Sequence, residues 1–189
     1  MKDSFPHAFY LGLSLLLVLA AACFSGCIGE NSTVKEVQPA YFEWMDTPLI
    51  DVTTGEIVTL RELTQDGTPI VLHLFATWCP YCNKQLGEST TLLQTYPGKV
   101  HVVAMDIDPN EDAKMLAEHV AKNAYDGIFV IAEKPVMQGL QEFFGEDLLA
   151  KGIPQSVIIR GNDIVYLGAG LRSSDVLLSN IDQVLQLKK

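Results

Sequence analysis

Charge is scarce in this chain of 189 residues, and positive charge is the scarcer kind. Charged residues make up 19% of the sequence, and 13 Lys and Arg stand against 23 Asp and Glu, which gives a formal net charge of -10 at pH 7. A protein with this balance is repelled by a phosphate backbone, so we expect no nucleic-acid partner. Hydrophobic residues reach 48%, which is too many for a disordered chain and enough to form a core.

Internal repeats and Gly/Ser or Gln/Asn tracts are absent as well. Their absence excludes solenoids, propellers and low-complexity segments. A length of 189 residues allows one domain and argues against several. We therefore expect a single folded domain that is a monomer.

Cysteine is rare too, and two of the 4 cysteines follow an apolar run near the N-terminus. Residues 8–24 carry no charge, and Ser14 is their only clearly polar residue. This run is short for a transmembrane helix, which needs about 20 residues, but it suits the core of a signal peptide. Small residues stand directly before Cys23 and again before Cys27, a pattern that resembles the lipobox of bacterial and archaeal lipoproteins.

In lipoproteins the lipobox cysteine becomes the lipidated N-terminus after cleavage. We favour Cys27 because Gly26 fits the pattern and polar residues follow at once, while Cys23 and an uncleaved anchor helix are the alternatives. Residues 1–26 are thus predicted to be a signal peptide, and residues 27–40, which are polar and lack an apolar period, a tether. Each alternative places the domain, residues 41–189, outside the cytoplasm, on the cell surface or in the periplasm.

The domain alternates predicted strands and helices. Short apolar runs bounded by turn residues indicate strands, and apolar residues three or four positions apart indicate helices. The predicted strands cover residues 49–52, 57–60, 70–75, 100–105, 128–132, 155–159 and 164–167, and the predicted helices cover residues 81–95, 136–144 and 174–187. The first two strands are expected to form a hairpin. Strands that alternate with helices predict an α/β sandwich with a mixed sheet.

A further helix is expected to begin at Asp108, because Pro109 and Glu111 follow at positions typical of a helix start. Phe143 and Phe144 are expected in the core. Val176 is expected on the apolar side of the last helix, beside Leu177.

Cys79 and Cys82 enclose Pro80 and Tyr81 where a buried strand gives way to a helix. The unpaired N–H groups at a helix N-terminus favour a thiolate on the first cysteine. With this spacing Cys82 can displace a substrate caught on Cys79, so we expect Cys79 to be exposed and Cys82 to lie further inward. The alternative, half of a zinc site, lacks a second CxxC or a close Cys/His pair.

Residues 42–187 resemble the thioredoxin superfamily, and within it the membrane-tethered TlpA/ResA-like thiol-disulfide oxidoreductases. Three segments carry the resemblance: residues 75–82 (FATWCPYC) are similar to the active-site strand end, residues 54–60 (TGEIVTL) to the added N-terminal hairpin, and residues 152–154 (GIP) to the cis-proline loop. The resemblance implies a thioredoxin-like three-layer sandwich with an added N-terminal β-hairpin.

The resemblance also implies which residues meet the substrate. The loop of Ile153 and Pro154 is expected to face the cysteines, and the backbone of Ile153 to pair with the substrate chain. Trp78, Pro80 and Tyr81 are expected to complete the contact. For Trp78 the alternative is a side chain that only packs against its neighbours.

Two positions depart from the family pattern. Thioredoxins commonly have Asp six residues before the first cysteine, where this chain has His73, and the TlpA/ResA-like proteins often have Glu three residues after the second, where it has Gln85. We hypothesise that His73 takes the proton of Cys82, or favours the thiolate when charged. The alternative is a core histidine bonded to a backbone carbonyl. Glu88 is a weaker candidate and is expected to be a solvated surface acid.

These observations predict an extracytoplasmic, membrane-anchored thiol-disulfide oxidoreductase that needs no cofactor or metal. The resemblance favours reduction of exported proteins, with electrons from a membrane thiol carrier and apocytochrome c or another exported thiol protein as the client. The alternative is a copper metallochaperone on the same fold, which would need a third ligand beside the cysteine pair. Peroxide reduction is disfavoured because the pattern around a peroxidatic cysteine is absent.

Overall fold

The computed structural model describes residues 41–146 and 148–186. The predicted signal peptide, the tether and the lipidation site Cys27, with its alternative Cys23, lie outside these residues. Among the described helices, none combines the length and the apolar character that crossing a membrane requires.

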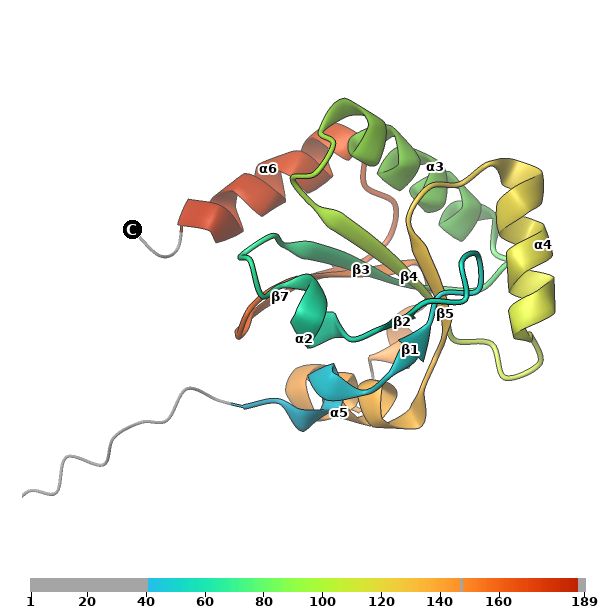
Figure 1. The fold of residues 1–189 in the computed structure, drawn as a ribbon, viewed down its shortest axis with the longest axis horizontal. Helices are drawn as coiled ribbons and strands as arrows, with labels where there is room; N and C mark the ends of the chain where they lie inside the picture. Colours follow the sequence, from blue (N-terminus) through green and yellow to red (C-terminus); the bar gives the residue numbers. More distant parts are fainter. Residues whose placement is uncertain (1–40, 147, 187–189) are drawn as a thin grey trace, which may run out of the picture. The chain divides into compact units, whose positions relative to one another are not determined.

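A five-stranded mixed sheet lies at the centre of the domain, in the order β5-β4-β3-β6-β7 (Figure 1). Central β3 (Ile70–Phe75) runs parallel to β4 (His101–Asp106), which runs parallel to β5 (Ile128–Ile131). On the other side, β6 (Gln155–Arg160) is antiparallel to β3 and to β7 (Asp163–Ala169). Every residue of β3 is buried, as its nearly continuous apolar sequence predicts.

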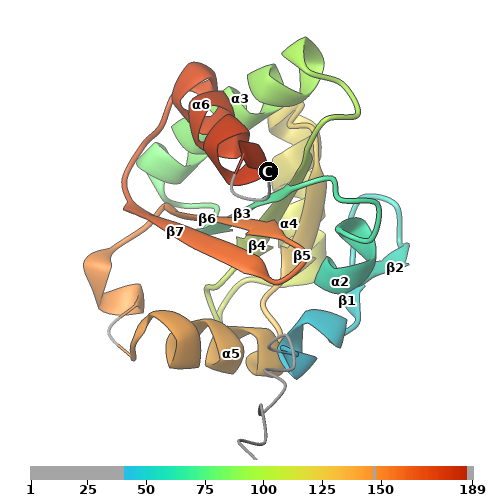
Figure 2. The ribbon, with the colours of Figure 1, turned by 90° about the vertical axis from the view of Figure 1, so that its left-hand side faces the viewer.

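Helices cover both faces of this sheet (Figures 1 and 2). On one face lie α3 (Pro80–Thr95), α4 (Ala113–Asn123) and α6 (Ser174–Gln186), which bury their apolar residues in two clusters against the sheet. The opposite face is covered by α5 (Lys134–Phe144). The predicted three-layer α/β sandwich with a thioredoxin-like arrangement is therefore confirmed.

The added hairpin is present but shorter than predicted. It consists of β1 (Leu49–Ile50) and β2 (Ile57–Val58), which pair in an antiparallel sheet of their own. The second strand was expected to continue to Leu60, but Leu60 begins a short helix instead.

This helix, α2 (Leu60–Leu63), begins with a capping box that the sequence analysis missed. The Thr59 hydroxyl accepts the Glu62 N–H, and the Glu62 carboxylate accepts the Thr59 N–H. Because these reciprocal bonds satisfy two backbone donors, they favour a helix over a longer strand. One more short helix, η2 (Leu149–Lys151), precedes β6.

The prediction that a helix begins at Asp108 is wrong. The N-cap of α4 is Asp112, whose side chain accepts the N–H of Met115 at 2.8 Å. Asp108 instead accepts the N–H of Asn110 at 2.8 Å and the indole N–H of Trp78 at 2.6 Å. Its carboxylate is thus used in a turn and a tertiary contact, and the helix starts at the next suitable acid.

Two side chains expected in the core are exposed. Phe143 has an exposed fraction of 45% because it lies at the rim of a groove, where the ring of Phe42 covers only its edge. Val176 is 46% exposed, whereas its neighbour Leu177 is fully buried. The apolar stripe of α6 is therefore narrower than predicted. Phe144 is half-buried and packs against Tyr166.

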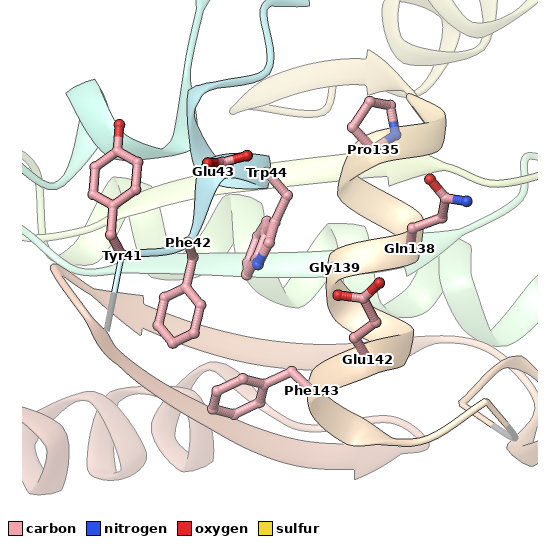
Figure 3. A pocket seen from close by; sticks show the side chains of 9 residues that line it. All are labelled: Tyr41, Phe42, Glu43, Trp44, Pro135, Gln138, Gly139, Glu142 and Phe143. Atoms are coloured by element: carbon pink, nitrogen blue, oxygen red, sulfur yellow. The ribbon is translucent and has the colours of Figure 1, made fainter. Parts of the chain in front are cut away.

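The groove lies between α5 and η1 (Glu43–Asp46), a 3-10 helix that precedes β1 (Figure 3). Figure 3 shows the ring of Trp44 turned toward Gly139, where α5 has no side chain. A Cβ atom added at Gly139 would overlap Cγ and Cδ1 of Trp44. The absence of a side chain at this position thus permits η1 to pack directly on α5.

Gly139→Ala is expected to lower the free energy of unfolding by roughly 1–3 kcal/mol, because the new methyl group displaces Trp44. The loss should outweigh the benefit of about 1 kcal/mol that alanine has over glycine inside a helix. Gly87→Ala in α3 is the matched control, since its Cβ would meet nothing within 4 Å. Urea unfolding measures both, and equal stability of the two variants would contradict this packing.

Candidate active site

Cys79 and Cys82 lie at the junction of β3 and α3 and form a disulfide. Cys79 is the N-cap of α3, and the N–H of Cys82 donates to Cys79 Sγ at 3.2 Å. Pro80 stands in the first turn, where its missing N–H has no intrahelical partner to lose. After reduction, the same N–H and the positive end of the helix dipole favour a thiolate on Cys79.

Cys79 is less accessible than predicted, whereas Cys82 is buried as expected. Cys79 was expected to be exposed, but its exposed fraction is only 4%, against 0% for Cys82. It is covered because its Sγ lies 3.8 Å from the carbonyl oxygen of Ile153. Beside the disulfide, the side chains of Trp78 and Tyr81 are exposed, at 65% and 63%.

The loop before β6 faces the disulfide. The Ile153–Pro154 peptide bond is cis, and the Ile153 carbonyl points toward Cys79. The buried side chain of Gln155 fixes this loop, since its amide donates to the carbonyl of Gly152 at 2.9 Å. The structure therefore places the predicted cis-proline loop beside the cysteines, as the resemblance implied.

His73 is fully buried between two serine hydroxyls. Its Nδ1 lies 3.0 Å from the hydroxyl of Ser156, and its Nε2 lies 2.8 Å from that of Ser89. Burial, assisted by the positive charge of Arg172, lowers the pKa of His73 to about 4. The ring is therefore neutral at neutral pH, where it cannot favour the thiolate by its charge. Besides the two hydroxyls, His73 has a hydrogen bond with the backbone at Gln155, which agrees with the alternative of a core histidine bonded to a backbone carbonyl.

Gln85 and Glu88 attach α3 to the start of α6. The Gln85 amide donates to the carbonyl of Arg172 at 3.1 Å, and its oxygen accepts the Arg172 N–H at 2.8 Å. Glu88 accepts the N–H of Ser174 at 2.8 Å. Glu88 was expected to be a solvated surface acid, but this bond at the N-terminus of α6 leaves it half-buried.

Three acidic residues near the active-site loop were not predicted from the sequence. Glu111 accepts both the N–H and the hydroxyl of Thr77, and Asp108 accepts the indole N–H of Trp78. Asp106 is buried at the end of β4. The one signal that could have predicted them is that β3 and β4 are parallel. The residues after β4 therefore lie at the same edge of the sheet as the cysteines after β3.

Among the described residues, no three His, Cys, Asp or Glu side chains are grouped so that they could hold a metal ion. The zinc alternative needs four ligands and the copper alternative a third ligand beside the cysteine pair. This part of the chain therefore lends neither alternative support.

Comparison with known proteins agrees with this geometry. Residues 59–132 match the family model described as Thioredoxin. This segment of the chain is therefore similar in sequence to thioredoxin domains. The thiol:disulfide interchange protein DsbE of Escherichia coli strain K12 is 29% identical over 148 residues, which cover 75% of this chain and 68% of that protein. The DsbE protein of Haemophilus influenzae is 27% identical over 106 residues, which cover 56% of this chain. The match spans only 52% of the length of that relative.

Solved structures support the fold. A secreted Mycobacterium tuberculosis disulfide oxidoreductase homologous to Escherichia coli DsbE superposes with a TM-score of 0.56 at 18% identity, over 76% of this chain and 99% of that one. At this identity the likeness concerns the fold alone. The disulfide at the helix N-terminus and the DsbE relatives support a thiol-disulfide oxidoreductase on this fold.

His73→Asn is expected to lower the free energy of unfolding by about 1–3 kcal/mol, because two buried serine hydroxyls lose a partner. Folding lowers the pKa of His73 from 6.5 to about 4, so the unfolded chain takes up the proton first. The stability that His73 contributes is thus lost as the pH falls from about 6.5 toward 4. Urea unfolding should show a smaller loss for the variant at about pH 4.5 than at about pH 7.

The same variant tests the proton-acceptor hypothesis. Since a ring with a pKa of about 4 is a weak base, substrate release by Cys82 should keep its wild-type pH profile between about pH 6 and 9. A shifted profile would instead identify His73 as the proton acceptor.

Proposed function

We propose that this chain reduces, or exchanges, disulfide bonds in exported proteins on the extracytoplasmic side of the cell membrane. The observation that carries the proposal is the disulfide of Cys79 and Cys82 at the N-terminus of α3, beside a cis-proline loop. Two further observations support it: the relatives are named thiol:disulfide interchange proteins, and the Mycobacterium tuberculosis protein is described as secreted.

In the reducing direction, both cysteines begin as thiols. The Cys79 thiolate attacks one sulfur of the substrate disulfide, a mixed disulfide forms, and the other substrate sulfur leaves as a thiolate. Cys82 then loses its proton and attacks the Cys79 sulfur. This step breaks the mixed disulfide, releases the second substrate thiolate and forms the Cys79–Cys82 disulfide seen here. Two electrons pass from the enzyme to the substrate, and the reverse reaction uses the same atoms.

The substrate chain is proposed to lie across the exposed surface beside Cys79. Trp78 and Tyr81 offer two exposed aromatic side chains there, and Pro80 is exposed as well. Ile153 is only half-buried, so its backbone is available to pair with an extended peptide, with Pro154 fixing the direction of the loop.

The resemblance to membrane-tethered family members supports the remaining assignments. We propose that Cys27 carries a lipid anchor, that residues 27–40 act as the tether, and that a membrane thiol carrier supplies electrons to a monomeric domain. Under this proposal the client is an exported thiol protein such as apocytochrome c. The reduction potential relative to these partners sets the direction of exchange.

Cys79→Ser is expected to reduce the rate of insulin reduction by roughly 10³-fold or more, because the attacking thiolate is gone. Cys82→Ser should instead accumulate a mixed disulfide between Cys79 and insulin, visible by non-reducing electrophoresis, since nothing releases it.

Cu(I) titration of the reduced wild type tests the alternative, a copper metallochaperone. Tight binding of one Cu(I) without insulin reduction would favour the metallochaperone.

Cys27→Ser is expected to abolish incorporation of radiolabelled fatty acid and to release the protein from the membrane fraction, because the anchored residue is lost. Cys23→Ser is the matched control and should remain labelled. Labelling that disappears in Cys23→Ser and persists in Cys27→Ser would reverse the assignment. Membrane association without label in the wild type would favour the uncleaved helix.

A further inference from the structure

A buried carboxyl group lies beside the active site and has no part in the exchange described above. Asp106 ends β4 opposite Phe75, the last residue of β3, and its exposed fraction is 1%. Its Oδ1 accepts the N–H of Asp108 at 3.0 Å. Its Oδ2 is buried and has no donor among the described residues. A buried carboxylate oxygen without a donor is costly, so this atom needs a physical explanation.

A second carboxyl group faces Asp106. Glu111 lies within hydrogen-bond contact of it, and both residues line the same small cavity. Glu111 is itself an acceptor toward Thr77: its Oε2 accepts the Thr77 N–H at 3.0 Å, and its Oε1 accepts the Thr77 hydroxyl. Two ionised carboxylates cannot bond to each other, so the contact requires a proton on one of them.

We propose that Asp106 and Glu111 share one proton, held on Asp106 Oδ2 and donated to Glu111, and that this bond positions the loop of Thr77 and Trp78 that leads into Cys79. The arrangement gives the orphaned oxygen a partner and leaves Glu111 ionised to hold Thr77. Asp106 and Glu111 are positioning residues, because they act on Cys79 through Thr77. Only the consequence for disulfide exchange rests on the proposed function.

The electrostatics of the pair agree with this placement of the proton. Burial, and then the hydrogen bond to Glu111, raise the pKa of Asp106 to about 8. Burial opposes ionisation of Glu111 as well, but hydrogen bonds from Asp106 and Thr77 hold its pKa below the usual value. The negative charge of Asp108 raises the pKa of both carboxyl groups.

Two cationic or basic side chains also face this group. Lys134, at the start of α5, lines the cavity that Asp106 and Glu111 share. His119 of α4 also lies near Glu111. Burial lowers the pKa of His119, and the negative charge of Glu111 acts in the opposite direction.

Thr77 is held from both sides, which is why the carboxyl pair can control the loop. On one side, Glu111 accepts the N–H and the hydroxyl of Thr77. On the other side, the Thr77 carbonyl accepts the side-chain amide of Asn83 at 3.1 Å. Asn83 in turn contacts Nε2 of His119 at 2.8 Å. When the shared proton leaves to solvent above about pH 8, two adjacent carboxylates repel each other and the hold of Glu111 on Thr77 weakens.

Carboxyl-carbon NMR titration of the full-length oxidised protein in mild detergent tests the shared proton directly. The Asp106 carboxyl should titrate within about one unit of pH 8 rather than near its ordinary value of 3.8. The Thr77 amide resonance should move with the same midpoint. An Asp106 midpoint below about 5 would overturn the proposal.

Asp106→Asn is the decisive variant, because asparagine keeps the shape and a donor but carries no titrating proton. The Thr77 transition near pH 8 should disappear, and its persistence would overturn the proposal. Glu111→Gln should lower the Asp106 midpoint, because glutamine can donate to Oδ2 and carries no repelling charge. Glu118→Gln on exposed α4 surface is the matched control and should leave both midpoints unchanged. If Asp106→Asn does not fold, the wild-type and Glu111→Gln titrations decide.

The consequence for exchange is measured separately. The ratio of the insulin-reduction rates of wild type and Asp106→Asn should change across about pH 8, whereas the ratio for Glu118→Gln should stay constant. A constant ratio for Asp106→Asn would overturn the positioning role. If the wild type reduces no insulin at all, the proposed function fails, and the Thr77 titration alone decides the inference.

Discussion

The turn from β3 into α3 is the constraint on which the rest of the domain depends. The chain leaves a strand buried on both faces and starts a helix at once, with Cys79 as its cap and the Cys82 N–H bonded to the Cys79 sulfur. A helix N-terminus presents unpaired N–H groups, so the bond that starts the helix also favours the ionised sulfur. The same atoms therefore start the helix and set the reactivity of Cys79. The buried strand β3 keeps this turn in place within the sheet.

The polar environment of the turn differs from the pattern the family resemblance implies. On β3 and α3, where related proteins often carry carboxylates, this chain has a neutral His73 and the amide of Gln85, which serve packing and the attachment of α6. Its buried carboxyl, Asp106, stands instead at the end of β4 and reaches the active-site loop through Glu111. The buried carboxyl group near the active-site loop thus stands on the neighbouring strand β4 rather than on β3 or α3.

Sequence patterns were reliable where the decisive residues are close in the chain. The apolar run of β3, the CxxC at its end and the Gly-Ile-Pro loop each carry a local signal, and each lies where it was predicted. The predicted start of α4 was wrong although Pro109 and Glu111 follow Asp108 at positions typical of a helix start. The Asp108 carboxylate is instead occupied by the Asn110 N–H and by the distant indole of Trp78, which no local pattern records. Phe143 was likewise expected in the core, but it lies at the rim of the groove and stays 45% exposed.

The sequence by itself determined the main strands and helices and the pair of cysteines that carries the chemistry, because these follow from periodicity and spacing within short segments. The thioredoxin-like architecture was implied by the resemblance to that superfamily. Only the tertiary structure decided how accessible Cys79 is, that His73 is neutral, and that Asp106 meets Glu111. Those properties depend on desolvation and on hydrogen-bond partners from other elements, and no local pattern records which side chains the fold brings together.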